Sequence, residues 1–269
     1  MKTIYYYQTF VGLNKLLTHI EDIDVIIISS LHFGKEDNLP YIHLNNNKTD
    51  DKIFDNLWLE THKAAVQNTT IMLMMGGAGG AYNELFSDFK TYYPLLKKLL
   101  YDKPWIRGID LDIEEKVKIQ NVQLLINQLI SDFGESFIIT MAPVASSLMT
   151  DGGSMGGFNY KKLYNSKEGK YIRWFNTQCY NSFSVDTYDT IIKNGYPPEK
   201  IIMGMESGQF NDKNFNEAIE IVKDLNKKYN NFGGVYDWEY LDAPPNKDDP
   251  SIWAMLMRTN TLKLKLKKR

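Results

Sequence analysis

Eight short runs of β-branched and apolar residues recur along the chain at a nearly regular spacing. They begin at residues 4, 25, 71, 106, 137, 174, 201 and 235, about 33 residues apart on average, and the stretches between them have the apolar periodicity of helices. Alternating strands and helices at this spacing predict a parallel sheet, whose strands are apolar because helices cover them. Eight such units predict a single (β/α)8 TIM barrel over residues 1–269 without an inserted second domain. An open doubly wound sheet is the alternative.

The expected strands are residues 4–10, 25–30, 71–75, 106–112, 137–141, 174–180, 201–205 and 235–238. The expected helices include residues 84–100, 117–130, 188–193 and 214–229. In a barrel the loops after the strands form the active face. Long loops are expected at about residues 31–56 and after residue 141, the second including the glycine-rich stretch 152–157. Only eight residues separate Met205 from Asn214, so no domain is inserted there and an open groove is predicted.

Composition excludes several classes of protein. The 31 basic and 33 acidic residues give a net charge of -2, so neither nucleic acid nor a membrane is expected as a partner. Cys179 is the only cysteine, which excludes an internal disulfide. No signal peptide or membrane span is recognisable, so a cytoplasmic protein and a mature secreted form both fit. The basic tail, residues 262–269, is interpreted as the solvated end of the last helix, with a targeting or lipid-surface signal as the alternative.

The segment 108–115, Gly-Ile-Asp-Leu-Asp-Ile-Glu-Glu, is the most informative in the chain. Alternate side chains of a strand share a face, so Asp110, Asp112 and Glu114 are expected to line up inside the barrel, with Arg107 on the opposite face. Like charges at this spacing are costly unless they share protons, which raises at least one carboxyl pKa. A carboxyl group with a raised pKa can act as a general acid. The alternative is that these acids only cap the next helix.

Other chemistries fit the sequence less well. An Asp-x-Asp pair can hold a metal and a nucleotide sugar, as in a glycosyltransferase, and a related pattern occurs in phosphoaspartate phosphatases, but no phosphate cradle accompanies it. The stretch 76–80 lacks the residues of a P-loop. Gly152-x-Ser154-x-Gly156 resembles a nucleophile elbow, but no strand directly precedes it. The four histidines lack metal-ligand spacing, so no metal and no cofactor are expected.

The acidic strand resembles the signature of glycoside hydrolase family 18, the chitinases and endo-β-N-acetylglucosaminidases. Further matches to this family fall after other predicted strands: Gly76-Gly77, Met141-Ala142-Pro143, Gln178-Cys179-Tyr180-Asn181 and Trp238. The resemblance covers residues 5 to about 240. Two positions depart from the family pattern, because Arg107 replaces an aspartate and Met74 replaces a serine.

The resemblance implies a substrate-assisted mechanism, in which the substrate's own 2-acetamido oxygen attacks the anomeric carbon. Glu114 would be the general acid, Asp112 would orient the acetamide, Asp110 would share its proton and Tyr180 would hold the acetamide oxygen. The residues implied to bind substrate are Tyr6, Gly76, Gly77, Met141, Gln178, Asn181 and Trp238. Tyr7 is the alternative to Tyr6.

We therefore expect an endo-glycosidase acting on β-1,4-linked N-acetylglucosamine as a monomer, with chitin as the first substrate. The chitobiose core of N-glycans is the alternative substrate. The alternative from another class is a chitinase-like lectin that binds without cutting. Because lectins of this fold commonly lack the acid, the presence of Glu114 favours an enzyme.

Overall fold

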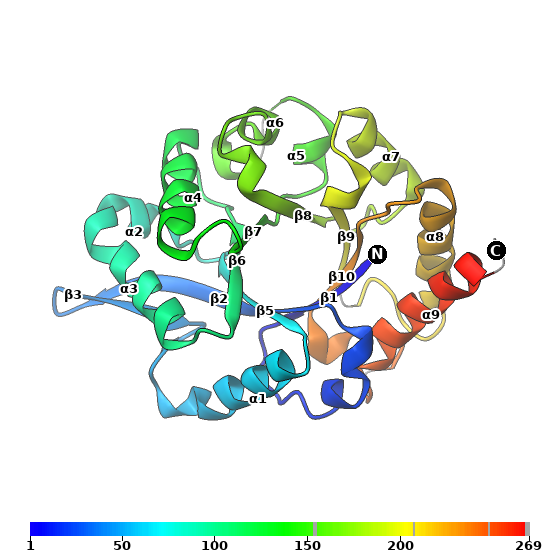
Figure 1. Ribbon diagram of the computed structural model, residues 1–269, viewed down its shortest axis with the longest axis horizontal. Coiled ribbons are helices and arrows are strands. Elements are labelled where there is room, and N and C mark those ends of the chain that lie inside the picture. The colour runs from blue at the N-terminus through cyan, green and yellow to red at the C-terminus, as the bar shows by residue number, and fades with distance from the viewer. Residues whose placement is uncertain (153–154, 207, 247, 267–269) are drawn as a thin grey trace.

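The computed structural model describes residues 1–152, 155–206, 208–246 and 248–266, with side chains described as far as Thr259. In this part of the chain, eight parallel strands close into a barrel surrounded by helices (Figure 1). Strand β1 pairs with both β2 and β10, which closes the sheet. The predicted single (β/α)8 barrel is confirmed. Its strands are β1 (Lys2–Tyr7), β2 (Val25–Glu36), β5 (Thr70–Gly76), β6 (Ile106–Asp112), β7 (Ile138–Met141), β8 (Ile172–Gln178), β9 (Ile201–Glu206) and β10 (Gly234–Trp238).

The helices around the barrel are α1 (Asp55–Val66), α2 (Tyr82–Ser87), α3 (Phe89–Asp102), α4 (Ile119–Phe133), α5 (Ser146–Met149), α6 (Tyr160–Tyr164), α7 (Val185–Lys193), α8 (Phe215–Lys228) and α9 (Ile252–Leu266). The expected helix over residues 84–100 is interrupted, because the Asp88 side chain accepts a hydrogen bond from the Thr91 amide and starts α3 as its cap. Within the described residues, no helix has the length and apolar character needed to cross a membrane.

Two sequence-predicted segments lie partly outside the described residues. The basic tail continues α9 as far as Leu266, and residues 267–269 are not described. In the glycine-rich stretch, Met155–Gly157 forms a 3-10 turn, whereas Ser154 of the apparent nucleophile elbow lies outside the described residues.

The prediction of a long loop at residues 31–56 is wrong for its first half, which forms strands. Strand β2 continues to Glu36 and turns back as β3 (Leu39–Leu44), which pairs with β4 (Asn47–Lys48). The turn residues Asp37 and Asn38 both have positive φ angles, 48° and 64°, as a tight hairpin turn requires. The hairpin packs beside α3, where the Phe33 and Tyr92 rings lie 5.7 Å apart. It adds an antiparallel wall to the barrel mouth at the end of β2.

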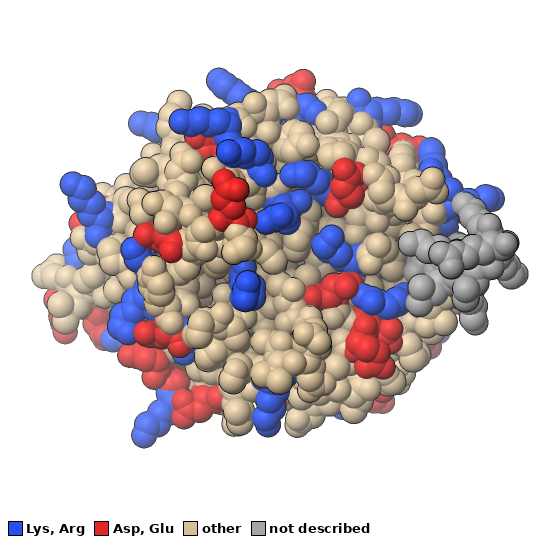
Figure 2. All heavy atoms as spheres, viewed as in Figure 1, with Lys and Arg blue, Asp and Glu red and all other residues tan. Residues whose placement is uncertain are grey.

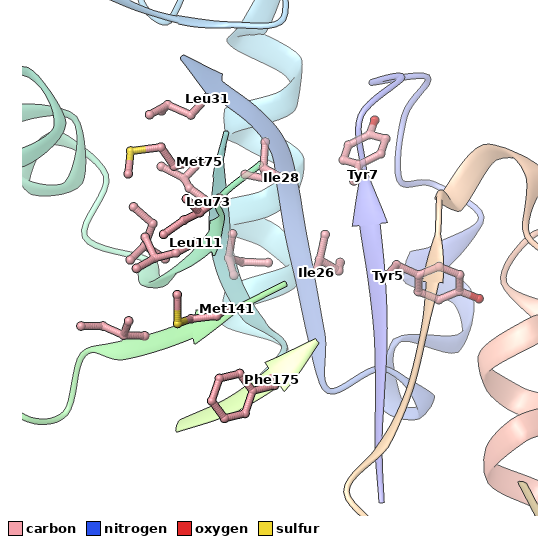
Figure 3. Close-up of a cluster of buried hydrophobic side chains, with 14 of the residues drawn as sticks. Tyr5, Tyr7, Ile26, Ile28, Leu31, Leu73, Met75, Leu111, Met141 and Phe175 are labelled. Carbon is pink, nitrogen blue, oxygen red and sulfur yellow. The ribbon is translucent and has the colours of Figure 1, made fainter. Parts of the chain in front are cut away.

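The strands separate two apolar layers. A small cluster fills the barrel interior with side chains that include Ile4, Tyr6, Val25, Ile27, Met72, Met74, Trp174, Ile202 and Tyr236. A larger cluster lies between the strands and the helices and includes the alternate residues Tyr5 and Tyr7 (Figure 3). This alternation fixes which side chains of each strand can reach the barrel interior.

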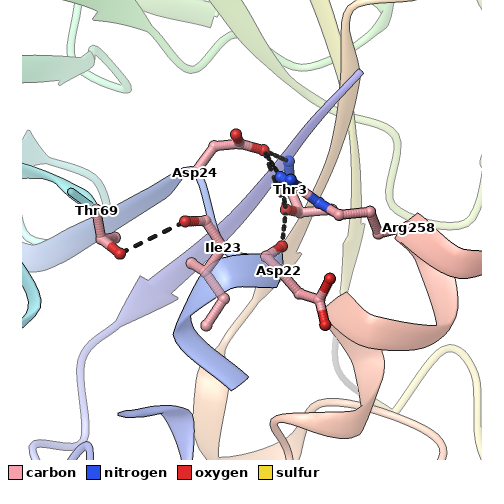
Figure 4. A network of polar contacts seen from close by, with 6 residues as sticks. All are labelled: Thr3, Asp22, Ile23, Asp24, Thr69 and Arg258. Atoms are coloured by element: carbon pink, nitrogen blue, oxygen red, sulfur yellow. Dashed lines mark hydrogen bonds and ion pairs between the residues drawn. The ribbon is translucent and has the colours of Figure 1, made fainter. Parts of the chain in front are cut away.

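A polar network connects the first two strands to the last helix, at the end of the barrel where the strands begin (Figure 4). The Arg258 guanidinium, on α9, forms an ion pair with Asp24, just before β2. The same Asp24 carboxylate accepts a 2.8 Å hydrogen bond from the Thr3 amide of β1. The network therefore joins the first two strands to the last helix at the end of the barrel opposite to its mouth.

The surface carries no dominant charge on the face shown in Figure 2, where basic and acidic side chains are interspersed. This distribution agrees with the formal net charge of -2.

Candidate active site

Asp110 and Asp112 lie inside the barrel, as strand alternation predicts. Asp110 is fully buried and Asp112 is 6% exposed. Arg107, on the opposite parity of β6, is exposed, and Ile109 and Leu111 belong to the outer apolar cluster. The side chain of Arg107, which departs from the family pattern, therefore points away from the acidic pair.

Three donors from other strands of the barrel, β1, β7 and β8, bind the Asp110 carboxylate. Its Oδ2 accepts a hydrogen bond from the Tyr6 hydroxyl at 2.6 Å, and its Oδ1 accepts from the Thr140 hydroxyl at 2.5 Å and from Asn176 Nδ2 at 3.0 Å. Burial raises the pKa of Asp110, and these hydrogen bonds oppose the shift. The donors favour the ionised form of Asp110.

Asp112 has fewer donors and a more strongly shifted pKa. Gln178 Nε2 donates a 3.2 Å hydrogen bond to Asp112 Oδ1. Burial, followed by the charges of Glu114 and Asp110, raises the pKa of Asp112 well above its ordinary value. Because Asp110 has three donors and Asp112 has one among the described residues, Asp112 is the member of the pair that binds a proton more readily.

Glu114 lies in the loop after β6 rather than inside the barrel. Its side chain is exposed at the mouth, which corrects the expectation that all three acids line the interior, because β6 ends at Asp112. Partial burial still raises the pKa of Glu114. A carboxyl group at the mouth with a raised pKa can deliver a proton to a bound molecule.

The next acidic residue, Glu115, caps a helix. Its carboxylate accepts hydrogen bonds from the backbone amides of Ala81, Tyr82 and Asn83 at the start of α2. This helix precedes β6 in the chain, and no motif in the sequence predicts the contact.

Gly76 and Gly77 allow β5 to approach the acidic pair. The Gly77 amide donates to the Asp112 carbonyl oxygen at 2.9 Å. A Cβ atom on Gly76 would lie 2.2 Å from that carbonyl oxygen, and one on Gly77 would lie 3.3 Å from Asp112 Oδ2 and 3.0 Å from the Met74 methyl carbon. Both residues also have positive φ angles, 97° and 79°. Only glycine fits these positions without strain.

Aromatic rings surround the acidic pair. Tyr6 has its ring 5.3 Å from that of Trp238, at the end of β10, and 4.9 Å from that of Tyr236. The Tyr236 hydroxyl donates to the Tyr180 hydroxyl at 3.3 Å. A Cβ atom on Gly204 would lie 1.9 Å from the Tyr236 ring, so this glycine makes room for it. Tyr7 points into the outer cluster, so Tyr6 is the first-strand tyrosine of this site.

Two predicted binding residues do not join this cluster. Met141 is fully buried in the outer apolar layer with Leu111 and Phe175, because Thr140 is the β7 residue that faces inward (Figure 3). The prediction that Met141 binds substrate is therefore wrong. Asn181 lies in the turn after β8 with a φ of 56° and an exposed side chain.

Thr140 and Asn176 are site residues that the sequence reasoning missed. Thr140 is the only polar residue of β7, and Asn176 precedes Gln178 by two positions on the same face of β8. Because alternate residues of a strand share a face, an inward-facing Gln178 also predicts that Asn176 faces the barrel interior.

Metal-capable side chains gather elsewhere. Among the described residues, ligand atoms of His19, Glu21 and Asp22 lie within 4.8 Å of one another. They belong to the 3-10 segment Leu16–Asp22 before β2, which places them at the end of the barrel opposite to the mouth. The acidic pair is therefore separate from this cluster.

Comparison with solved structures decides the family. A fungal endo-β-N-acetylglucosaminidase from glycosyl hydrolase family 18 is 30% identical, with a TM-score of 0.87 over 97% of this chain and 98% of that one. The chain belongs to glycoside hydrolase family 18. No family model matches the sequence, and no curated protein does.

Two further structures widen the comparison for this family 18 chain. Chitinase ChiC from Aspergillus fumigatus is 29% identical, with a TM-score of 0.82 over 96% of this chain and 98% of that one. The chitinase-like agglutinin from Robinia pseudoacacia is 11% identical, with a TM-score of 0.63 over 94% of this chain and 99% of that one, which shows the fold alone. The family and the fold are those of a glycoside hydrolase.

Proposed function

We propose that this chain is a retaining endo-glycosidase that hydrolyses the β-1,4 bond between two N-acetylglucosamine residues. The observation that carries the proposal is the arrangement of three carboxyl groups. Asp110 and Asp112 are buried side by side on β6, and Glu114 follows them at the exposed mouth. One group is thereby left accessible to a glycosidic oxygen while the other two act beneath the sugar.

Glu114 protonates the departing glycosidic oxygen. Partial burial raises the pKa of Glu114, which favours the protonated form that this step requires. After the leaving sugar departs, the same carboxylate takes a proton from the attacking water, so the acid is regenerated in each cycle.

The nucleophile is the acetamide oxygen of the sugar at subsite -1, which forms a cyclic oxazolinium ion. Asp112 accepts a hydrogen bond from the acetamide N–H and stabilises the positive charge of this ion, while its shared proton shifts toward Asp110. Gln178 holds Asp112 in place through the 3.2 Å hydrogen bond. The Tyr180 hydroxyl donates to the acetamide oxygen and orients it for attack. This mechanism requires neither a metal nor a cofactor.

Trp238 forms the apolar floor beneath the sugar, supported by the Tyr6 ring at 5.3 Å. Sugar rings present C–H groups to such a face. Because β9 ends at Glu206 and α8 begins at Phe215, the connection after β9 is too short for an additional domain. The groove is therefore open, and cleavage occurs at internal linkages.

Chitin, the substrate expected from the sequence, and the chitobiose core of N-glycans both contain this linkage. A lectin is the second candidate function, since a chitinase-like agglutinin shares the fold. The presence of Glu114 at the mouth argues for the enzyme.

The test is product analysis by mass spectrometry with chitopentaose and with a high-mannose glycopeptide, combined with NMR of the first product. Cleavage between two N-acetylglucosamine residues with an initial β-anomer supports the proposal. Binding of either compound without any turnover would support the lectin, and an initial α-anomer would exclude the retaining mechanism.

A further inference from the structure

A buried carboxylate, that of Glu239, lies where the ends of β1 and β10 meet at the barrel mouth. The side chain is 8% exposed, and the residue directly follows Trp238, the proposed floor of the -1 subsite. Burial of a carboxylate costs free energy unless donors replace its water. The proposed mechanism does not use this group, so its place at the rim of the site calls for another role.

Three donors from the two strand ends bind the Glu239 carboxylate. Its Oε2 accepts from the Gln8 amide at 3.2 Å, and its Oε1 accepts from the Thr9 hydroxyl at 3.2 Å and from the Leu241 amide at 3.1 Å. Burial raises the pKa of Glu239, and the hydrogen bonds oppose the shift. The donors therefore favour the ionised form, which accepts at both oxygens. We call Glu239 and these three partners the Glu239 clasp.

The clasp bridges β1 and β10 beyond the point where their pairing ends. The last paired residues of these two strands are Tyr5 and Asp237, one position short of Tyr6 and Trp238. The backbone ladder thus sets the separation of the strands before the two rings, and the clasp sets it after them.

The rings of Tyr6 and Trp238 lie between the ladder and the clasp. Their centroids are 5.3 Å apart, and the Tyr6 hydroxyl donates to Asp110 at 2.6 Å. Trp238 is only partly buried, so part of its ring is open to a ligand. A shift of the end of β10 relative to β1 would therefore move the floor relative to the acidic pair.

The partner of Glu239 on the β1 side is itself held in place. The Gln8 carbonyl oxygen accepts from Asn45 Nδ2 at 2.9 Å, and Asn45 Oδ1 accepts from the Ser30 amide at 3.3 Å. The β2–β3 hairpin thus binds one side of the Gln8 backbone and Glu239 binds the other. The carboxylate is anchored on a segment with little freedom to move.

We propose that Glu239 is a positioning residue: its carboxylate fixes Trp238 relative to Tyr6 and Asp110, and so sets how tightly the sugar at subsite -1 is held. The inference rests on the proposed function. Because the carboxylate is occupied by its three donors, it acts through the tryptophan ring.

Glu239→Gln tests this role. Glutamine offers one acceptor oxygen in place of two, so one of the two backbone amides faces an NH2 group. Since the floor contacts the sugar both before and during the reaction, its displacement should raise KM by ~3- to 30-fold and change kcat by less than about 2-fold. A merely structural role would lower the melting temperature and leave KM unchanged. Thr9→Val removes one donor, is the milder variant if Glu239→Gln does not fold, and should raise KM by ~2- to 5-fold.

Glu168→Gln is the matched control. Glu168 is 1% exposed, and its carboxylate accepts from Gln123 Nε2 at 2.8 Å and from Asn127 Nδ2 at 3.0 Å. It lies before β8, at the end of the barrel where the strands begin. The control should lower the melting temperature without a change in KM.

A double-mutant cycle with Trp238→Ala shows whether Glu239 acts through the tryptophan. The Kd for chitopentaose is measured with Glu114→Gln present in every variant, so that binding is observed without turnover. The proposal predicts that Glu239→Gln weakens binding when Trp238 is present and has little effect once Trp238 is alanine.

The outcomes separate this proposal from the proposed function. Additive effects in the cycle, or an unchanged KM and Kd in Glu239→Gln, would overturn the positioning role and leave the proposed function intact. Coupling in Kd, combined with no cleavage of chitopentaose or of the glycopeptide by the wild type, would support the positioning role and overturn the proposed function.

Discussion

The Gly77 amide donates a 2.9 Å hydrogen bond to the carbonyl oxygen of Asp112, and a Cβ atom on Gly77 would lie only 3.3 Å from the Asp112 carboxylate. This contact joins the end of β5 to the end of β6. It brings a backbone turn against the group that we propose to orient the acetamide. The glycine is therefore needed for the position of a side chain in another strand.

Gly77→Ala should lower both stability and activity. The positive φ of 79° costs a non-glycine residue about 1–2 kcal/mol, and a Cβ atom 3.3 Å from Asp112 Oδ2 would displace the carboxylate. We expect kcat to fall by ~10- to 100-fold. Gly134→Ala is the control, because Gly134 has a φ of 80° with nothing within 4 Å of its Cβ position. Thermal unfolding should show a loss of stability in both variants. Steady-state kinetics should show a loss of kcat for Gly77→Ala alone.

Glu114→Gln should lower kcat by ~10²- to 10⁴-fold while oligosaccharide binding persists, because only the proton donor is removed. The neighbouring Glu115→Gln is the control. It should cost about 1–2 kcal/mol of unfolding free energy, since one carbonyl oxygen replaces the carboxylate that accepts from three amides of α2. Steady-state kinetics, calorimetry and thermal unfolding distinguish the two. Equal kinetic losses in both variants would contradict the assignment of the acid.

Asp112→Asn should abolish turnover and change how stability depends on pH. Burial and the charges of Glu114 and Asp110 raise the pKa of Asp112, so the folded protein binds more protons than the unfolded chain. The contribution of Asp112 to stability is therefore full below its unfolded pKa and declines as pH rises toward its folded pKa. Removal of the carboxyl group should increase the unfolding free energy at neutral pH relative to wild type and flatten this decline. Urea unfolding at several pH values measures it, and identical pH dependence in both proteins would count against a shared proton.

Met74 faces the barrel interior, where its sulfur accepts a hydrogen bond from the Ser29 hydroxyl at 3.6 Å. Met74→Ser would place a hydroxyl group beside the acidic pair. Donation to the ionised member lowers the pKa of the pair, so the activity optimum should move toward acid. The lost side chain should cost about 2–5 kcal/mol of stability. Met72→Ser, one step further down the same face of β5, should show the loss of stability without the shift. Unchanged limbs of the kcat/KM profile for Met74→Ser would remove Met74 from the titration.

The barrel could be predicted from the sequence because its strands repeat one local pattern. Each of the eight apolar runs became a barrel strand, with ends shifted by a few residues. The hairpin after β2 could not be predicted, because β2 continues past its apolar run and its two halves pair with different partners. The contact from Asn45 of this hairpin to Gln8 was therefore invisible in the sequence.

The acidic pair was predictable because alternation within one strand is a local property. The prediction that Met141 binds substrate was wrong because it relied on the Met141-Ala142-Pro143 motif. Alternation along β7 turns Thr140 into the barrel and Met141 toward the helices. The roles of Asn176 and Glu115 depend on contacts between distant strands and loops. Only the closed barrel brings those residues to Asp110 and to α2.

Participation of the substrate's acetamide group is the central claim, and the direct test varies that group alone. The measurement is kcat/KM for oligosaccharides that differ only at the -1 sugar, which is N-acetylglucosamine, its N-trifluoroacetyl analogue or glucose. Since the acetamide oxygen is the nucleophile, we predict a steep fall for the trifluoroacetyl analogue, whose oxygen is less nucleophilic, and no cleavage of the glucose compound. Equal rates for the three substrates would contradict the account, because an enzyme carboxylate would then have to attack the sugar.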